Sequence, residues 1–216
     1  MKRIIIAITA IFLGFSSFSQ ERQKVEIETI YGNMLIELYN ETPIHRDNFI
    51  KLANSGFYDG TLFHRVIPAF MIQGGDPVSK KDNPQEQIGN GGPGYTLPSE
   101  FDEKLIHKKG ALAAARMPDA VNPKKESSGS QFYIVEGQVY DASKLELMEK
   151  RMGIKMNEIQ KKMYSTIGGT PHLDGNYTVF GEVIRGLDII SKVSNVNRNK
   201  NNLPLEKVVM KVRVVK

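Results

Sequence analysis

The chain has 216 residues, and its 29 Lys and Arg against 24 Asp and Glu give a formal net charge of +5. The excess of base is small and is spread over separated lysine pairs, whereas nucleic-acid binding requires a concentrated basic stripe. The chain contains no cysteine, so disulfides are excluded and an exported domain would depend on its core alone. We therefore expect no nucleic-acid partner.

Residues 1–19 have the pattern of a secretory signal peptide. Two basic residues precede an apolar run from Ile4 to Phe15, and Ser17-Phe18-Ser19 has the small-x-small form found before a cleavage site. The apolar run is shorter than the roughly 20 residues that a membrane-spanning helix needs, which makes an uncleaved anchor the weaker interpretation. We predict one domain over 20–216, no stable membrane anchor, and a periplasmic or secreted location.

A hairpin and a helix are predicted next. Val25–Thr29 and Met34–Leu38 alternate apolar and polar residues around a glycine-containing turn, which predicts two antiparallel strands. Thr42 can cap a helix that stops at Gly56. His45 on this helix is expected to face solvent. The predicted core side of the helix consists of Ile44, Phe49, Leu52 and Ala53.

The segment from Phe63 to Asp76 combines one cation with an apolar cluster. Its apolar members are Phe63, Val66, Ile67, Phe70, Met71 and Ile72. An apolar cluster around Arg65 and Gln73 suits a ligand that is mostly apolar and carries an amide. The guanidinium of Arg65 keeps its charge in such surroundings and offers a fixed fork of donors to the amide. The residues alone leave open that Arg65 is an ordinary surface cation.

Two later segments contain many small residues. Gly89, Gly91 and Gly94 form a literal G-x-G-x-x-G, but no apolar strand precedes it and no helix start follows it, so we predict a structural surface loop rather than a dinucleotide site. Gly110–Met117 is a predicted strand of small side chains. These side chains either leave room for a bound backbone or pack tightly in the core.

A charged stretch at about 141–168 is rich in helix formers and is broken at Gly153, which predicts two short helices. Met148, Met152 and Met156 would share one face if the helix continued through the glycine. That face either packs on the host domain, as apolar helical spacing usually does, or binds a partner or client, since methionine adapts to varied apolar shapes.

The C-terminal part returns to strand patterns. Val179–Val183 and Val208–Val215 are predicted strands, and Leu187–Val193 fits a short helix between them. Mainly antiparallel strands with two host helices favour a mainly β fold, and closure into a barrel would remove exposed strand edges.

Three motifs resemble those of the cyclophilins, the peptidyl-prolyl cis-trans isomerases. Phe63-His64-Arg65 through Gln73-Gly74-Gly75-Asp76 resembles the family signature, and Gly129–Ile134 and Leu173–Gly181 resemble two further blocks in family order. The resemblance implies a closed eight-stranded antiparallel β-barrel capped by two α-helices, with about 141–168 as a helical insertion. It also implies isomerisation of proline-containing unfolded or exported polypeptides by a monomer, without a cofactor or metal.

The resemblance also assigns site residues. Arg65 matches the residue that donates to the prolyl nitrogen, and Gln73 matches the residue that holds the substrate backbone and supports the arginine. The implied substrate-binding residues are Phe70, Met71, Ala115, Gln131, Tyr133, His172, Leu173 and Tyr177. Tyr133 replaces the more usual phenylalanine, His172 stands where the best-known members carry tryptophan, and Tyr177 stands where many have histidine. Arg116 departs from the asparagine of eukaryotic members.

Two classes of function are open, an isomerase and a peptide-binding module or holdase with little turnover on the same scaffold. The presence of Arg65, Gln73 and the apolar pocket residues together favours the enzyme. None of the four histidines has metal-ligand spacing, and neither H-E-x-x-H nor G-x-S-x-G occurs, so a metal site and a hydrolase lack support. We interpret His64 as an ordinary buried polar residue and place His107 in a turn before two lysines.

Overall fold

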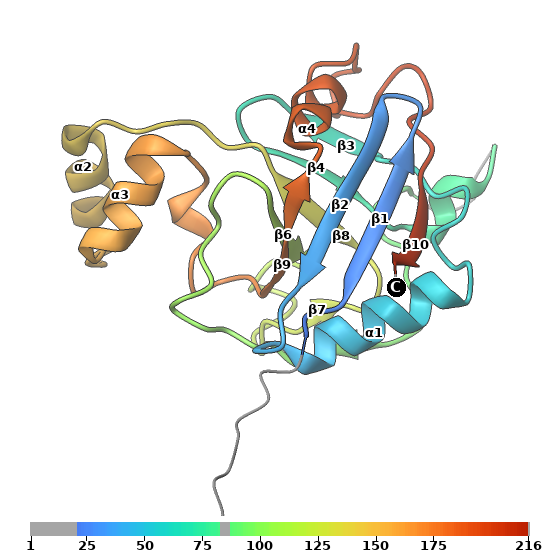
Figure 1. The fold of residues 1–216 in the computed structure, drawn as a ribbon, viewed down its shortest axis with the longest axis horizontal. Helices are drawn as coiled ribbons and strands as arrows, with labels where there is room; N and C mark the ends of the chain where they lie inside the picture. The colour runs from blue at the N-terminus through green and yellow to red at the C-terminus, as the bar shows by residue number, and fades with distance from the viewer. Residues whose placement is uncertain (1–20, 83–86, 216) are drawn as a thin grey trace, which may run out of the picture.

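A computed structural model describes residues 21–82 and 87–215, so the expected signal peptide lies outside the described residues. The body of the protein is an eight-stranded antiparallel sheet with the order β10-β1-β2-β9-β6-β8-β4-β3 (Figure 1). Its strands are β1 (Lys24–Thr29), β2 (Gly32–Leu38), β3 (Arg65–Ile67), β4 (Met71–Gly74), β6 (Ala111–Ala114), β8 (Phe132–Val135), β9 (Val179–Arg185) and β10 (Lys211–Val215). The short strands β5 (Thr96–Leu97) and β7 (Ser127–Ser128) pair separately.

The sheet is curled but open, which corrects the expectation of a closed barrel. Within the described part of the chain, no strand ladder joins the two edge strands, β10 and β3. The segments that precede them meet at an isolated bridge, Leu62 to Val209, flanked by backbone hydrogen bonds that include Phe63 N to Val208 O at 2.9 Å and Met210 N to Thr61 O at 2.9 Å.

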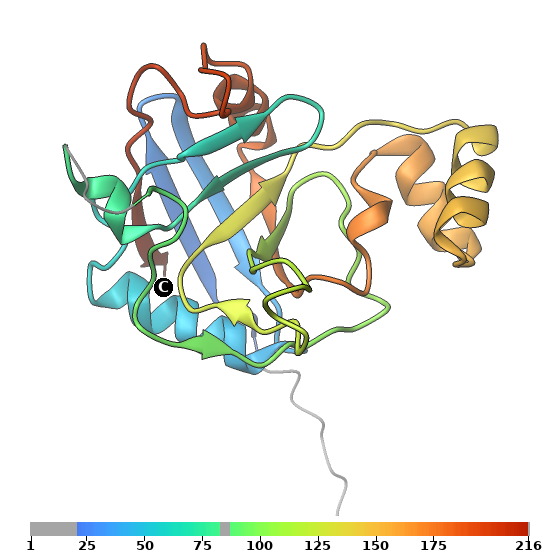
Figure 2. The same ribbon diagram turned by 180° about the vertical axis from the view of Figure 1, so that it is seen from behind.

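Four α-helices occur in the described residues: α1 (Pro43–Asn54), α2 (Ala142–Met152), α3 (Glu158–Thr166) and α4 (Leu187–Ser194). Helices α1 and α4 cover opposite ends of the curled sheet, as the two expected host helices should (Figures 1 and 2). Phe49 of α1 and Ile190 of α4 both belong to the main hydrophobic core that the sheet encloses. None of the helices in the described ranges is long and apolar enough to cross a membrane.

The start of α1 differs from the prediction. Thr42 makes no side-chain cap hydrogen bond, and Ile44 is 43% exposed, whereas His45 is buried at 2%. The carboxylate of Glu100 caps the helix instead, because it accepts hydrogen bonds from Ile44 N at 3.0 Å and His45 N at 2.9 Å and lies 2.6 Å from His45 Nδ1. A partner 55 residues away in sequence therefore turns His45 inward, which the local pattern could not reveal.

Acidification is expected to destabilise the fold through its buried histidines. Burial lowers the pKa of His45 although Glu100 opposes the shift, and burial lowers the pKa of His64 although Asp76 opposes it. Both folded pKa values lie below the unfolded value of about 6.5. The unfolded chain therefore binds more protons as the pH falls through this value, and the free energy of unfolding decreases.

Thermal unfolding midpoints measured from about pH 7 to about pH 5 check this expectation. His64→Gln should give a shallower decline than the wild type, because glutamine is polar but does not titrate and therefore removes the contribution of His64 to the slope. Identical slopes for the two proteins would assign the pH dependence to other groups.

The helices α2 and α3, here called the α2–α3 pair, project from one side of the sheet (Figures 1 and 2). Gly153 ends α2 in the left-handed conformation, and a capping box of Asn157 and Gln160 begins α3, so the two predicted helices are confirmed. The pair is held by its own small core. This core contains Tyr140, Leu145, Met156 and Tyr164, with Ile106 and Met148 packed against it.

Met148, Met152 and Met156 do not form one continuous helical face, so that prediction is wrong. Met156 lies in the connection between the helices and is buried at 4%, so it packs into the small core rather than continuing the surface of α2. The chain leaves and re-enters the body at Gly137 and Gly169, where a Cβ on either glycine would overlap the backbone of a neighbouring segment. This close approach seats the base of the pair directly beside His107.

Candidate active site

Strand register places Arg65 and Gln73 side by side. Arg65 of β3 pairs with Gln73 of β4, and Gln73 pairs with Tyr133 of β8. Directly opposed residues on neighbouring strands project from the same face of a sheet, so these three side chains form one row. Arg65 Nη1 donates to Gln73 Oε1 at 3.2 Å.

The amide of Gln73 is oriented from its other side by a second glutamine. Gln73 Nε2 donates to Gln131 Oε1 at 3.2 Å, and Gln131 Nε2 donates to the carbonyl oxygens of Gly89 at 2.9 Å and Gly91 at 2.7 Å. The backbone N–H groups of both glycines donate in turn to the buried carboxylate of Asp76. The glycine-rich segment is therefore a structural loop, and it supports the site through Gln131.

A pocket of about 100 Å³ lies over this row of side chains. Its lining residues are Arg65, Phe70, Met71, Gln73, Ala115, Arg116, Tyr133, Leu173 and Tyr177. All of them except Arg116 are residues that the sequence predicted for the site. Met71, Ala115 and Tyr133 are buried, so strands β4 and β8 and the residue after β6 supply the floor, while Arg65, Gln73 and Arg116 bring polar groups to the lining.

The two remaining predicted residues lie beside this pocket rather than in its lining. Gln131 lines an adjoining cavity of about 830 Å³, which shares Gln73, Ala115 and Arg116 with the first. His172 is exposed and stacks on Phe70, with ring centroids 5.6 Å apart and an interplanar angle of 24°. His172 therefore contacts the pocket wall through Phe70.

Arg65 is a cation with open donors. Burial lowers the pKa of Arg65, while Tyr177 opposes the shift, and an arginine in a protein stays protonated near neutral pH. Among residues 21–82 and 87–215, its guanidinium has a single hydrogen-bond acceptor, Gln73. Most of its N–H groups can therefore donate to a ligand in the pocket.

Arg116 uses its donors differently. It donates to the carbonyl oxygens of Asn176 at 2.8 Å and Met117 at 3.0 Å and to Asp119 at 2.5 Å, and its guanidinium carbon lies 4.6 Å from the ring centre of Tyr177. These contacts hold Arg116 as part of the wall, although sequence reasoning recorded it only as a departure from the family pattern.

Sequence reasoning missed His107. It is fully buried, and its Nε2 lies 2.9 Å from the hydroxyl of Tyr133, while its Nδ1 lies 2.8 Å from Asp174 Oδ1. The available signal was Tyr133 itself, because a tyrosine in place of phenylalanine brings a buried hydroxyl that needs a polar partner. The partner is far away in sequence, so the pattern could not identify it.

Comparisons with known proteins agree on one family. The family model of the cyclophilin type peptidyl-prolyl cis-trans isomerases matches residues 24–214. A putative bifunctional phosphatase/peptidyl-prolyl cis-trans isomerase of Streptococcus pyogenes is 34% identical over 87% of this chain, which spans 37% of that protein. A peptidyl-prolyl cis-trans isomerase-like 1 of Neurospora crassa is 32% identical over 89% of this chain and 94% of its own length.

A crystal structure of a Cryptosporidium parvum cyclophilin type isomerase is similar with a TM-score of 0.68 and 26% identity, covering 90% of this chain and 98% of that one. A second structure of that protein, determined in the presence of the dipeptide Ala-Pro, has a TM-score of 0.67 and 26% identity, covering 90% of this chain and 99% of that one. The chain belongs to the cyclophilin-type peptidyl-prolyl cis-trans isomerase family.

Proposed function

We propose that this protein accelerates rotation about X-Pro peptide bonds in exported polypeptides and thereby assists their folding. The observation that carries the proposal is Arg65, which lines the same pocket as Phe70 and Met71, is oriented by Gln73, and keeps most of its donors open. Uncatalysed X-Pro isomerisation takes tens to hundreds of seconds and can limit folding.

The reaction needs neither a nucleophile nor a metal. Conjugation holds the peptide C–N bond with a barrier of about 18 to 20 kcal/mol. Twisting the bond returns the lone pair to the prolyl nitrogen, so a donor aimed at that nitrogen favours the twisted state. One charged hydrogen bond from Arg65 contributes about 1.5 to 3 kcal/mol, which corresponds to about one to two powers of ten in rate.

The pocket supplies the rest of the acceleration. A twisted amide has lost part of its dipole, so a site of low polarity disfavours it less than water does. Phe70, Met71 and Leu173 provide apolar surface for the prolyl ring. Gln73, held by hydrogen bonds at both ends of its amide, is placed to keep the substrate backbone still while the preceding carbonyl rotates.

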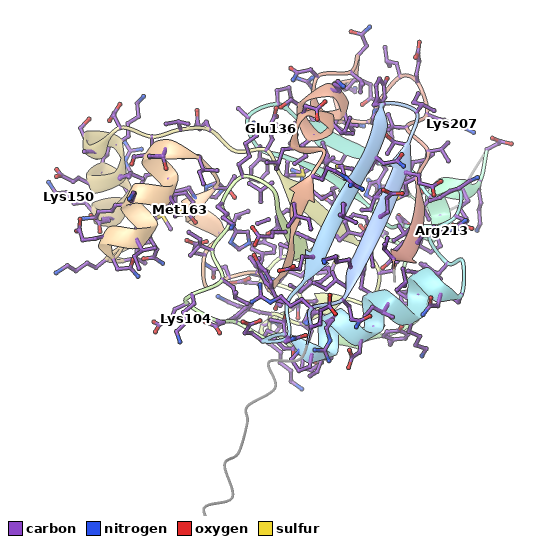
Figure 3. The ribbon with its side chains drawn as sticks, viewed as in Figure 1. Lys104, Glu136, Lys150, Met163, Lys207 and Arg213 are labelled. Atoms are coloured by element: carbon purple, nitrogen blue, oxygen red, sulfur yellow. The ribbon has the colours of Figure 1, made fainter. Side chains whose placement is uncertain are left out.

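The second candidate, a holdase, is favoured by apolar side chains on the α2–α3 pair that remain exposed: Leu147 at 47%, Ile154 at 40% and Ile159 at 74%. In Figure 3 the pair, marked by Lys150 and Met163, projects to one side of the sheet. Substoichiometric protein in a proline-limited refolding reaction distinguishes the candidates, because an enzyme turns over whereas a holdase acts only near equal concentrations. Arg65→Ala is the matched variant.

Export adds a separate expectation. Expressed in a bacterial host, the full chain should lose residues 1–19, so that the mature protein begins at Gln20 and is recovered outside the cytoplasm. Mass spectrometry of the fractionated protein measures this result. A variant with both Lys2 and Arg3 changed to Glu should be exported less, because the positive n-region is lost. Recovery of an intact Met1 terminus in the cytoplasm would contradict the proposal.

A further inference from the structure

A buried series of hydrogen bonds joins the candidate pocket to the α2–α3 pair. The Tyr133 hydroxyl lies 2.9 Å from His107 Nε2, and His107 Nδ1 lies 2.8 Å from Asp174 Oδ1. The Tyr164 hydroxyl, on α3, donates to Asp174 Oδ2 at 2.6 Å. We call these four residues the tyrosine relay. Tyr164 and His107 are fully buried, and Tyr133 is 5% exposed.

The Asp174 carboxylate, which can only accept hydrogen bonds, decides which groups of the relay donate and which accept. The Asp174 carboxylate accepts from Tyr164 and from the backbone N–H of His107 at 2.8 Å, so His107 Nδ1 beside it acts as a donor. In a neutral imidazole the other nitrogen is then an acceptor. Nε2 thus accepts from the Tyr133 hydroxyl, and this orients the Tyr133 ring. Burial raises the pKa of both tyrosines, which keeps their hydroxyls protonated.

The relay supports two parts of the pocket lining, the ring of Tyr133 and the segment that contains Leu173 and Tyr177. Tyr133 is opposite Gln73 in the β4–β8 register and stacks on His107 with an interplanar angle of 13°. Asp174 follows Leu173 directly and precedes Tyr177, and these two residues also line the pocket. Holding the Asp174 carboxylate therefore holds the segment that supplies them.

Backbone hydrogen bonds fix the end of α3 against the segment that contains His107. Thr170 N donates to His107 O at 2.8 Å, and Lys109 N donates to Gly168 O at 2.9 Å, directly beyond the end of α3. The absence of a side chain at Gly169 allows the Tyr164 ring to lie against the backbone there. Displacing Tyr164 would therefore disturb Asp174 and His107 together.

We propose that Tyr164 is a positioning residue for the proline pocket, which acts through Asp174 and His107 on the Tyr133 ring, so that the α2–α3 pair is a working part of the site. This inference rests on the isomerase function proposed above. Misplacement of a positioning group by about 1 Å can cost roughly 100-fold in rate. Losing one hydroxyl that acts through two other residues should cost less, about 3- to 30-fold in kcat/KM.

Tyr164→Phe removes the distal hydroxyl and keeps the ring. Tyr140→Phe is its matched control, because Tyr140 belongs to the same small core but its hydroxyl accepts from Gln138 and lies outside the relay. Cis–trans exchange of an Ala-Pro peptide, followed by NMR, gives kcat and KM for each protein. We expect Tyr164→Phe to lower kcat/KM by about 3- to 30-fold, mainly through KM, and Tyr140→Phe to leave it within about twofold.

A double variant separates positioning from a general loss of structure. If Tyr164 acts through the Tyr133 hydroxyl, Tyr164→Phe should have almost no further effect in a Tyr133→Phe background. The ¹⁵N shift of His107 Nε2 should also change in Tyr164→Phe and stay unchanged in Tyr140→Phe. Equal kcat/KM values for the two single variants, or additive effects in the double variant, would overturn the inference. Inactivity of the wild-type protein would overturn the proposed function itself.

Discussion

Arg65→Ala is expected to lower the rate of isomerisation by about 10- to 100-fold. The variant loses the charged donor that stabilises the prolyl nitrogen in the twisted state, which contributes about 1.5 to 3 kcal/mol. The fold should survive, because Arg65 is only partly buried and its one hydrogen bond in the described structure goes to Gln73. The measurement is NMR exchange of a proline peptide together with proline-limited refolding of a protein substrate.

Arg65→Lys is the matched control. It retains the positive charge but replaces the planar fork with a single ammonium group, so it should recover part of the lost rate and remain below the wild type. Equal acceleration by wild type and Arg65→Ala would reject Arg65 as the donor. If all three proteins improved refolding only at concentrations close to that of the client, the holdase would be the better description.

Asp76→Ala is expected to reduce the free energy of unfolding by about 3 to 5 kcal/mol. The Asp76 carboxylate is fully buried and accepts from Val78 N at 2.8 Å, from Gly89 N, and from Gly91 N at 3.3 Å. Its removal leaves these backbone donors without an acceptor inside the protein, and each costs about 1 to 3 kcal/mol. Urea unfolding with an unchanged m-value measures the loss.

Asp76→Asn should be less harmful, because the amide keeps one oxygen acceptor in the same place. Activity should follow the same order, since Gly89 and Gly91 hold Gln131, and Gln131 orients Gln73. A loss of less than about 1 kcal/mol in Asp76→Ala would mean that water replaces the carboxylate without cost.

Local patterns predicted most of the elements. The β1–β2 hairpin, α1, α4 and the two helices α2 and α3 all lie where apolar periodicity, helix-forming residues and glycines placed them. These signals work because they arise from residues within a few positions of each other. The same reasoning failed for His45, whose burial depends on Glu100, and for Met156, whose position depends on the end of α2 at Gly153.

The motifs supplied residues that the structure brings together. Arg65, Gln73 and Tyr133 come from motifs far apart in the sequence, yet strand register sets them in one row over the pocket. Their chemical roles remain predictions until the variants are measured. The relay was not predicted, because His107 and Tyr164 lie outside the three motifs and the hydrogen bonds that join them to Tyr133 and Asp174 form only in the folded chain.

The amino-acid sequence by itself determined the family, the β1–β2 hairpin, the two C-terminal strands, and the four helices α1, α2, α3 and α4. Only the tertiary structure decided that the sheet stays open, that Glu100 caps α1, and that Tyr164 is linked to the pocket through Asp174. The reason is physical: periodicity and motifs record contacts between near neighbours, whereas a buried carboxylate or hydroxyl takes whichever partner the folded chain brings within about 3 Å.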